Sequence, residues 1–259
     1  MSTTRRFAPT GRLPLLHHLR QTLAIVLLFC AGLGPALAAE SLMIAVGAGY
    51  KRSIGELAAA FERRSGIRLE PLFGNMGQVL AQAGQSDRVA LVLGDQAFLE
   101  EAGQVAFSRY LPVGRGRLVL AWPNGKRLAE PADLAAPGFA RIALPDPRHA
   151  VYGKAASQFL ARSALAPRLQ GRLLTVATVP QVSAYLTSGE VDAGFVNLTE
   201  ALALSGRIGG YRELDPGLYD PIRIVAGVIR GRENRPGVAE LAAFLETSEA
   251  RAALARHGL

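Results

Sequence analysis

The sequence predicts an α/β protein of two similar lobes, each a mainly parallel sheet flanked by helices, with two crossover strands joining the lobes. Short apolar segments alternate with amphipathic ones, and glycine-rich turns separate them. Parallel strands need such long crossover connections, because a tight turn can join only antiparallel strands. The same alternation restarts midway along the chain, which predicts a second lobe built like the first.

The first lobe is predicted from three repeats of strand, turn and helix. Its strands are short apolar runs over residues 41–46, 67–73 and 89–93. The first helix carries Ile54, Leu57 and Phe61 at spacings of three and four residues, so their side chains share one face. Two further helices are expected, one beginning near Val79 and one over residues 96–102.

The second lobe repeats this order. Its predicted strands cover residues 117–122, 142–144, 173–178 and 193–196. Its predicted helices cover residues 153–162, 180–188 and 199–204. A last strand over residues 222–229 leads to one long C-terminal helix over residues 238–257, whose apolar side chains keep helical spacing. Since no strand follows for it to cover, we expect this helix to return to the first lobe.

The two lobes are therefore expected to be joined twice, near residues 117–122 and near residues 222–229. The predicted boundaries assign residues 39–116 and 225–259 to lobe 1 and residues 117–224 to lobe 2. A cleft is expected between the lobes.

Residues 1–38 are predicted to be a cleavable signal peptide. Four arginines precede an apolar run from Thr22 to Leu33, and Ala36-Leu37-Ala38 places small residues where a signal peptidase reads. The run is shorter than the roughly 20 residues of a membrane-spanning helix. We expect a soluble mature protein in the periplasm, exported by the Sec or the twin-arginine route. An uncleaved N-terminal anchor and lipidation at Cys30 are the alternatives.

The composition excludes several classes of function. Removing residues 1–38 removes four arginines and no acid, which lowers the formal charge from +8 to +4. The remaining basic residues form no run longer than a pair, so no nucleic-acid partner is expected. The only cysteine, Cys30, leaves with the signal peptide. The mature chain is therefore expected to lack a disulfide, a thiol nucleophile and a cysteine metal site.

Four strand-to-helix turns predict the ligand site. These turns are Gly47-Ala48-Gly49-Tyr50, Gly74-Asn75-Met76-Gly77-Gln78, Asp146 to Gly153, and Val196-Asn197. In a parallel α/β lobe such turns gather at one edge, where helix N-termini present unpaired N–H groups and partial positive charge. Glycine there lets the backbone approach a ligand closely. This arrangement favours an anion that is bound without a basic side chain.

Catalytic and metal-binding motifs are not found in the sequence. His149 is the one histidine near the predicted site, where it could act as a base oriented by Asp146 or could simply cap a loop. Histidine pairs at metal spacing and the third glycine of a dinucleotide motif are missing. We therefore expect a binding protein with no cofactor and no metal, rather than an enzyme.

In order and spacing, these turns resemble those of the periplasmic molybdate-binding proteins of ABC importers, over residues 42–259. The resemblance is carried by Phe73-Gly74-Asn75-Met76-Gly77, by Asp146-Pro147 with His149 and Gly153, by Gly189-Glu190-Val191-Asp192-Ala193-Gly194, and by Arg256-His257-Gly258-Leu259. It implies a two-lobed periplasmic-binding-protein fold. It also implies a small oxyanion as ligand, molybdate or tungstate, and an ABC permease in the membrane as partner of a monomer.

The side chains at the implied contacts differ from the family pattern, which indicates a divergent subgroup. The family's two serine hydroxyls fall on Gly49 or Tyr50 and on Met76, and its tyrosine hydroxyl falls near Asn197. Its alanine and valine amides map near Tyr152 and Val182. Each lost hydrogen bond to a charged ligand costs roughly 1.5 to 3 kcal/mol.

Other polar side chains of the same turns are expected to compensate. The predicted ligand contacts are Gly49, Tyr50, Lys51, Asn75, Met76, Tyr152, Val182 and Asn197. Two alternatives remain open at this point. One is a binding protein for a carboxylated organic ligand or a chelated metal, and the other is an enzyme on the same scaffold.

Overall fold

The computed structural model describes residues 1–3 and 40–259, and residues 40–259 lie in one compact unit. Apart from its first three residues, the predicted signal peptide lies outside the described residues. Among the described residues, no helix combines the length and the apolar character that crossing a membrane requires.

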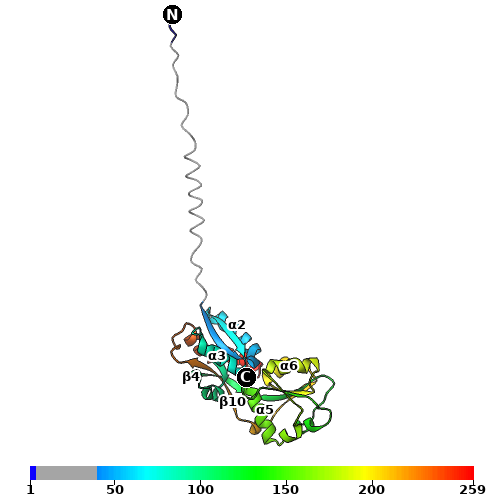
Figure 1. The fold of residues 1–259 in the computed structure, drawn as a ribbon. Helices are drawn as coiled ribbons and strands as arrows, with labels where there is room; N and C mark the ends of the chain where they lie inside the picture. Colours follow the sequence, from blue (N-terminus) through cyan, green and yellow to red (C-terminus); the bar gives the residue numbers. More distant parts are fainter. Residues whose placement is uncertain (4–39) are drawn as a thin grey trace. The chain divides into compact units, whose positions relative to one another are not determined.

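The first sheet has five strands in the order β2, β1, β3, β10, β4. Figure 1 labels two of them, β4 and β10. Their bounds are β1 (Ser41–Gly47), β2 (Arg68–Gly74), β3 (Val89–Asp95), β4 (Phe107–Gly116) and β10 (Ile222–Ile229). Strand β1 pairs in parallel with β2 and β3, and β10 pairs antiparallel with β3 and β4. Every residue of β3 is buried, as expected for an apolar strand covered on both faces.

Helices cover this sheet. They are the 3-10 helix η1 (Ala48–Tyr50), then α2 (Lys51–Ser65), α3 (Met76–Gln85), α4 (Gln96–Glu101), α8 (Val238–Leu245) and α9 (Ser248–Arg256). Helix α2 buries Ile54, Leu57 and Phe61, which is the predicted apolar face. The ring of Phe61 packs on Phe244 of α8 at 5.6 Å between centroids, so the C-terminal segment covers the first sheet.

The prediction of one long C-terminal helix was wrong. Helix α8 ends at Leu245, and α9 begins after Thr247, whose hydroxyl accepts a hydrogen bond from the amide of Ala250. A threonine in this position satisfies an amide that would otherwise lack a partner, so it starts a new helix. Strands β4 and β9 were also missed by the sequence analysis.

The second sheet has the order β7, β6, β8, β5, β9. Its strands are β5 (Leu118–Trp122), β6 (Ile142–Pro145), β7 (Leu173–Val176), β8 (Ala193–Asn197) and β9 (Gly210–Glu213). Strand β6 pairs in parallel with β7 and β8, and β5 pairs antiparallel with β8 and β9. Each sheet thus combines two parallel with two antiparallel pairs and is more mixed than predicted.

The helices of the second sheet are η2 (Pro131–Ala135), α5 (Val151–Arg162), η3 (Ala166–Leu169), α6 (Val179–Ser188), α7 (Leu198–Ala203) and η4 (Pro216–Leu218). Helix α6 begins with a capping box, in which the Thr178 hydroxyl accepts from the Gln181 amide and the Gln181 side chain accepts from the Thr178 amide. The two-lobed α/β architecture is confirmed. All of β10 belongs to the first sheet and all of β5 to the second.

Gly116 lies where β4 passes into the second lobe, and a side chain is not tolerated there. A Cβ atom at Gly116 would lie 2.4 Å from the hydroxyl of Tyr152 in α5 and 2.5 Å from Ile222 at the start of β10. Both connections between the sheets and the first turn of α5 therefore meet at this glycine.

Gly116→Ala is expected to lower the free energy of unfolding by about 1 to 3 kcal/mol, because the added methyl group overpacks this junction. Chemical denaturation measures the change. Gly138→Ala is the control, since a Cβ there meets no atom within 4 Å. Equal stabilities of the two variants would contradict the close approach.

Candidate ligand site between the lobes

A cavity of about 30 Å³ lies between the lobes. It is lined by Gly47 to Tyr50 and Gly74 to Met76 from the first lobe, and by Ala150 to Tyr152 and Thr178 to Val179 from the second. Pockets for drug-sized ligands hold roughly 300 to 1,000 Å³. In this conformation the cavity therefore has room for a small ion or a few waters, but not for an organic molecule.

The first turns of α5 and α6, two helices of the second lobe, open into this cavity. Val151 and Tyr152 are the first residues of α5, and Val179 is the first residue of α6. Amides in a first turn have no acceptor in their own helix, and within residues 40–259 these three have no other acceptor. The helix dipoles add partial positive charge at the same point. The cavity wall thus offers hydrogen-bond donors to an anion.

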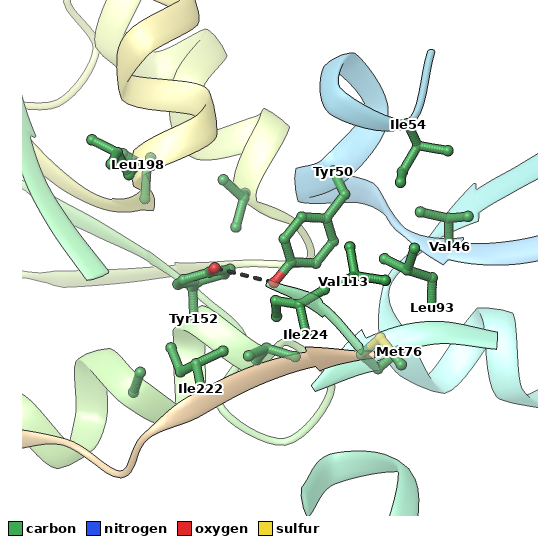
Figure 2. Packing of buried hydrophobic residues seen from close by; sticks show 14 of the residues in the cluster. Val46, Tyr50, Ile54, Met76, Leu93, Val113, Tyr152, Leu198, Ile222 and Ile224 are labelled. Atoms are coloured by element: carbon green, nitrogen blue, oxygen red, sulfur yellow. Dashed lines mark hydrogen bonds between the residues drawn. The ribbon is translucent and has the colours of Figure 1, made fainter. Parts of the chain in front are cut away.

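Two buried tyrosines meet across the lobes beside this cavity (Figure 2). The hydroxyl oxygens of Tyr50 in η1 and Tyr152 in α5 lie 3.1 Å apart, and each residue is 2% exposed. Burial raises the pKa of both hydroxyls well above the ordinary value of 10.0. Both therefore keep their protons at neutral pH. When one hydroxyl donates to the other, the accepting hydroxyl still has a proton that it can donate to a ligand.

Asn197, at the start of α7, ties the second lobe to the first. Its Nδ2 donates to the carbonyl oxygen of Gly49 at 2.9 Å, and its Oδ1 accepts from the amide of Glu200 at 3.2 Å. The residue is completely buried. Both ends of its amide are thus used, and Asn197 does not line the cavity.

Met76 also links the lobes. Its amide donates to the carbonyl oxygen of His149 at 2.8 Å, so this first-turn amide is already paired. Its sulfur lies against Gly47 and Gly94, where added Cβ atoms would approach within 3.3 and 3.0 Å of it. Met76 therefore lines the cavity mainly through packing.

Asn75 lines the cavity and caps α3. Its Oδ1 accepts from the amide of Gln78 at 2.9 Å, while the Gln78 side chain accepts from the amide of Asn75 at 3.0 Å. This capping box uses the oxygen of the Asn75 side chain. The NH₂ group remains as a donor, for which no acceptor is found in the described part of the chain.

His149 belongs to the contact between the lobes. Its Nδ1 lies 2.7 Å from Oδ2 of Asp146, and the hydrogen bond from His149 lowers the pKa of that carboxyl. Its ring packs on Gly77, where a Cβ would lie 3.0 Å from the ring. His149 does not line the cavity, which favours the loop-capping interpretation over that of a base.

Five of the eight predicted contacts line the cavity, namely Gly49, Tyr50, Asn75, Met76 and Tyr152. Lys51, Val182 and Asn197 do not. Lys51 is exposed, with its Nζ 6.0 Å from the ring centroid of Phe73. Val182 is buried in α6, and its amide donates to the carbonyl oxygen of Thr178 at 3.4 Å.

The sequence analysis missed several groups of the site. Val151, Thr178 and Val179 line the cavity, and the spacing of Thr178 and Gln181 is a capping-box signal that could have placed the start of α6. Lys154 of α5 forms an ion pair with Glu101 of α4 at 2.8 Å and so bridges the lobes. No sequence pattern indicated this pair.

The sequence and the fold of this chain are similar to those of known proteins. Residues 42–259 match the family model of the bacterial extracellular solute-binding proteins. The molybdate-binding protein ModA of Azotobacter vinelandii is 29% identical over 242 residues, covering 90% of this chain and 95% of that protein. ModA of Rhodobacter capsulatus is 27% identical, covering 91% and 94%.

The same likeness holds for a solved structure. The periplasmic molybdate-binding protein of Azotobacter vinelandii superposes with a TM-score of 0.74 at 23% identity, covering 84% of this chain and 97% of that one. The resemblance to the periplasmic molybdate-binding proteins is confirmed.

Asn197→Asp is expected to lower the free energy of unfolding by about 1 to 3 kcal/mol. The carboxylate keeps the acceptor that caps α7 but removes the donor to Gly49 and places a negative charge against its carbonyl oxygen. Urea denaturation measures the change. Asn124→Asp, which removes an exposed donor to the Arg207 carbonyl oxygen, is the control. The lobe contact is disproved if both variants unfold at the same urea concentration.

Alkaline pH is expected to destabilise the protein through Tyr50 and Tyr152. The pKa of each tyrosine is raised in the folded state. Their contribution to the free energy of unfolding is therefore complete below pH ~10, the ordinary pKa of an unfolded tyrosine. It is lost as the pH rises above that value, because the tyrosines of the unfolded chain ionise first. The double variant Tyr50→Phe/Tyr152→Phe should lose less stability between pH ~9 and ~11 than the unmodified protein. Denaturation curves at several pH values measure this, and parallel losses would refute it.

Proposed function

Because this chain belongs to the bacterial extracellular solute-binding proteins, we propose that it captures a small tetrahedral oxyanion, molybdate or tungstate, between its lobes. In this proposal it acts in the periplasm as a monomer and delivers the anion to an ABC permease in the membrane. The observation that carries the proposal is a cavity of about 30 Å³ into which unpaired amides of α5 and α6 open.

The chemistry of the cavity wall favours a fully deprotonated anion. Amides, the two tyrosine hydroxyls and the NH₂ group of Asn75 are donors. None of the lining residues carries a carboxylate. A protonated oxyanion such as hydrogen phosphate needs a hydrogen-bond acceptor for its own proton. The lining of this cavity offers no carboxylate as that acceptor. Molybdate, tungstate and sulfate only accept hydrogen bonds, so they match this donor set.

The charge of the anion would be balanced by backbone dipoles. None of the lining residues carries a positive charge, so the first turns of α5 and α6 supply the positive potential. Hydrogen bonds to a charged ligand are worth roughly 1.5 to 3 kcal/mol each. Several such bonds offset the loss of the anion's hydration.

Capture would proceed by closure of the lobes about the two connections near Gly116 and Ile222. Closure brings η1 and α3 of the first lobe against α5 and α6 of the second. The hydrogen bonds Tyr50 to Tyr152 and Asn197 to Gly49 then span the lobes. A ligand that contacts both lobes stabilises the closed form, because it has fewer partners in the open form.

Titration calorimetry of the purified protein tests this function. Molybdate or tungstate should bind with one site per chain, sulfate should bind more weakly or equally, and phosphate should bind at least about tenfold more weakly. Tyr152→Phe should weaken molybdate binding roughly tenfold or more, because it removes a neutral donor beside the cavity.

Tyr185→Phe is the matched control, since within residues 40–259 the Tyr185 hydroxyl has no hydrogen-bond partner and does not line the cavity. The proposal fails if none of the tetrahedral oxyanions binds. The assignment of the cavity fails if molybdate binds equally well to Tyr152→Phe and to the control.

A further inference from the structure

A second and much wider groove lies between α2 of the first lobe and α6 and α7 of the second. Its volume is about 620 Å³, which falls in the range of roughly 300 to 1,000 Å³ typical of sites for small organic molecules. It shares no lining residue with the small cavity. The two spaces therefore suit ligands of different size.

Three positively charged side chains line this groove. Lys51 and Arg52 lie in the first turn of α2, and Arg207 follows α7. Among the described residues, none of the three has a carboxylate within ion-pair distance. Since the cations come from both lobes, an anion that reaches both sides would contact both lobes at once.

Glu56, the acidic residue on the α2 side of the groove, already pairs with two basic side chains. Glu56 accepts hydrogen bonds from the guanidinium of Arg256 and from Nε2 of His257, the latter at 2.7 Å. These bonds, first that from Arg256, lower the pKa of the Glu56 carboxyl. The charge of Glu56 is thus balanced by the C-terminal segment, and within residues 40–259 Glu56 forms no ion pair with Lys51 or Arg52.

A buried carboxyl forms part of the opposite wall. Glu200 and Ser183 are 5% and 6% exposed, and the Ser183 hydroxyl donates to Oε2 of Glu200 at 3.0 Å. The second oxygen, Oε1, has no hydrogen-bond partner within residues 40–259. In that part of the chain every fully buried side-chain polar atom has a hydrogen-bond partner, so Oε1 is not fully buried. Because Glu200 lines the groove, Oε1 faces the groove. Burial raises the pKa of this carboxyl, while the Ser183 hydrogen bond and the nearby charge of Arg52 lower it. Oε1 is left as a hydrogen-bond acceptor at the wall.

We propose that this groove binds a small organic polycarboxylate that also carries a hydroxyl group. Its carboxylates lie against Lys51, Arg52 and Arg207, and its hydroxyl hydrogen-bonds to Glu200. This ligand matches the volume of the groove, its three cations and the buried carboxyl of Glu200. Because the walls belong to different lobes, the occupied groove favours the closed arrangement. The groove site does not depend on the proposed oxyanion function.

Titration calorimetry with citrate tests the groove. Citrate should bind the unmodified protein, and Arg52→Glu/Arg207→Glu should weaken its binding roughly tenfold or more. The control Arg109→Glu/Arg168→Glu makes the same change of net charge at exposed positions, one in each lobe, outside the groove. It should change citrate affinity less than about twofold. Tricarballylate, which is citrate without its hydroxyl, should bind more weakly than citrate.

Competition separates the two sites. Citrate should still bind when molybdate is saturating, since the two spaces have no lining residue in common. Displacement of citrate by molybdate would show that citrate binds in the small cavity, and it would overturn the proposal. The proposal is also overturned if citrate does not bind at millimolar concentration, or if the control variant loses as much citrate affinity as Arg52→Glu/Arg207→Glu. Circular dichroism verifies that each variant is folded. If molybdate fails to bind while citrate behaves as expected, the oxyanion function falls and the groove stands.

Discussion

The contact between the lobes at Tyr50 and Tyr152 is the constraint on which the site depends. With the hydroxyl oxygens 3.1 Å apart, the η1 turn cannot move away from α5 without breaking a buried hydrogen bond. The absence of a side chain at Gly116 makes room for the Tyr152 hydroxyl beside the connection between the sheets. The distance between the lobes is thereby fixed at the inner end of the cleft. The contacts of Asn197 with Gly49 and of Met76 with His149 also join the lobes, and the ion pair of Lys154 with Glu101 adds a further link.

The fold was largely predictable, because apolar periodicity is local information. In helix α2 the residues predicted to form the apolar face are buried, and in strand β3 every residue of the apolar run is buried. Strand β4 escaped prediction because it buries only two of its ten residues, Val113 and Gly116, and is ordered through pairing with β10, more than 100 residues away. The break between α8 and α9 depends on one hydroxyl at Thr247, which an apolar pattern does not report.

The sequence predicted which backbone turns form the site, but it predicted less well which side chains point into the cavity. Turns that follow parallel strands must gather at one edge of their own sheet. Gly49 and Asn75 therefore lie together at the edge of the first sheet, and Tyr152 lies at the edge of the second sheet that faces them across the cavity. The direction of a helical side chain depends on the phase of its helix. Lys51, one residue after Tyr50, does not line the cavity; it borders the wide groove, and its Nζ lies 6.0 Å from the ring centroid of Phe73. The sequence also could not show that both ends of the Asn197 amide are paired with backbone groups, since one of its partners belongs to the other lobe.

The two interlobe spaces would select anions by different physical means. In the small cavity, buried donors and helix dipoles act without a basic side chain, so selection rests on size and on the absence of a carboxylate acceptor. In the wide groove, exposed cations act through solvent, where salt screens their attraction over about 10 Å. Binding in the groove should therefore weaken with ionic strength, whereas binding in the cavity should depend on it far less. The proposed closure of the lobes would complete both sites, since each takes its lining residues from both lobes.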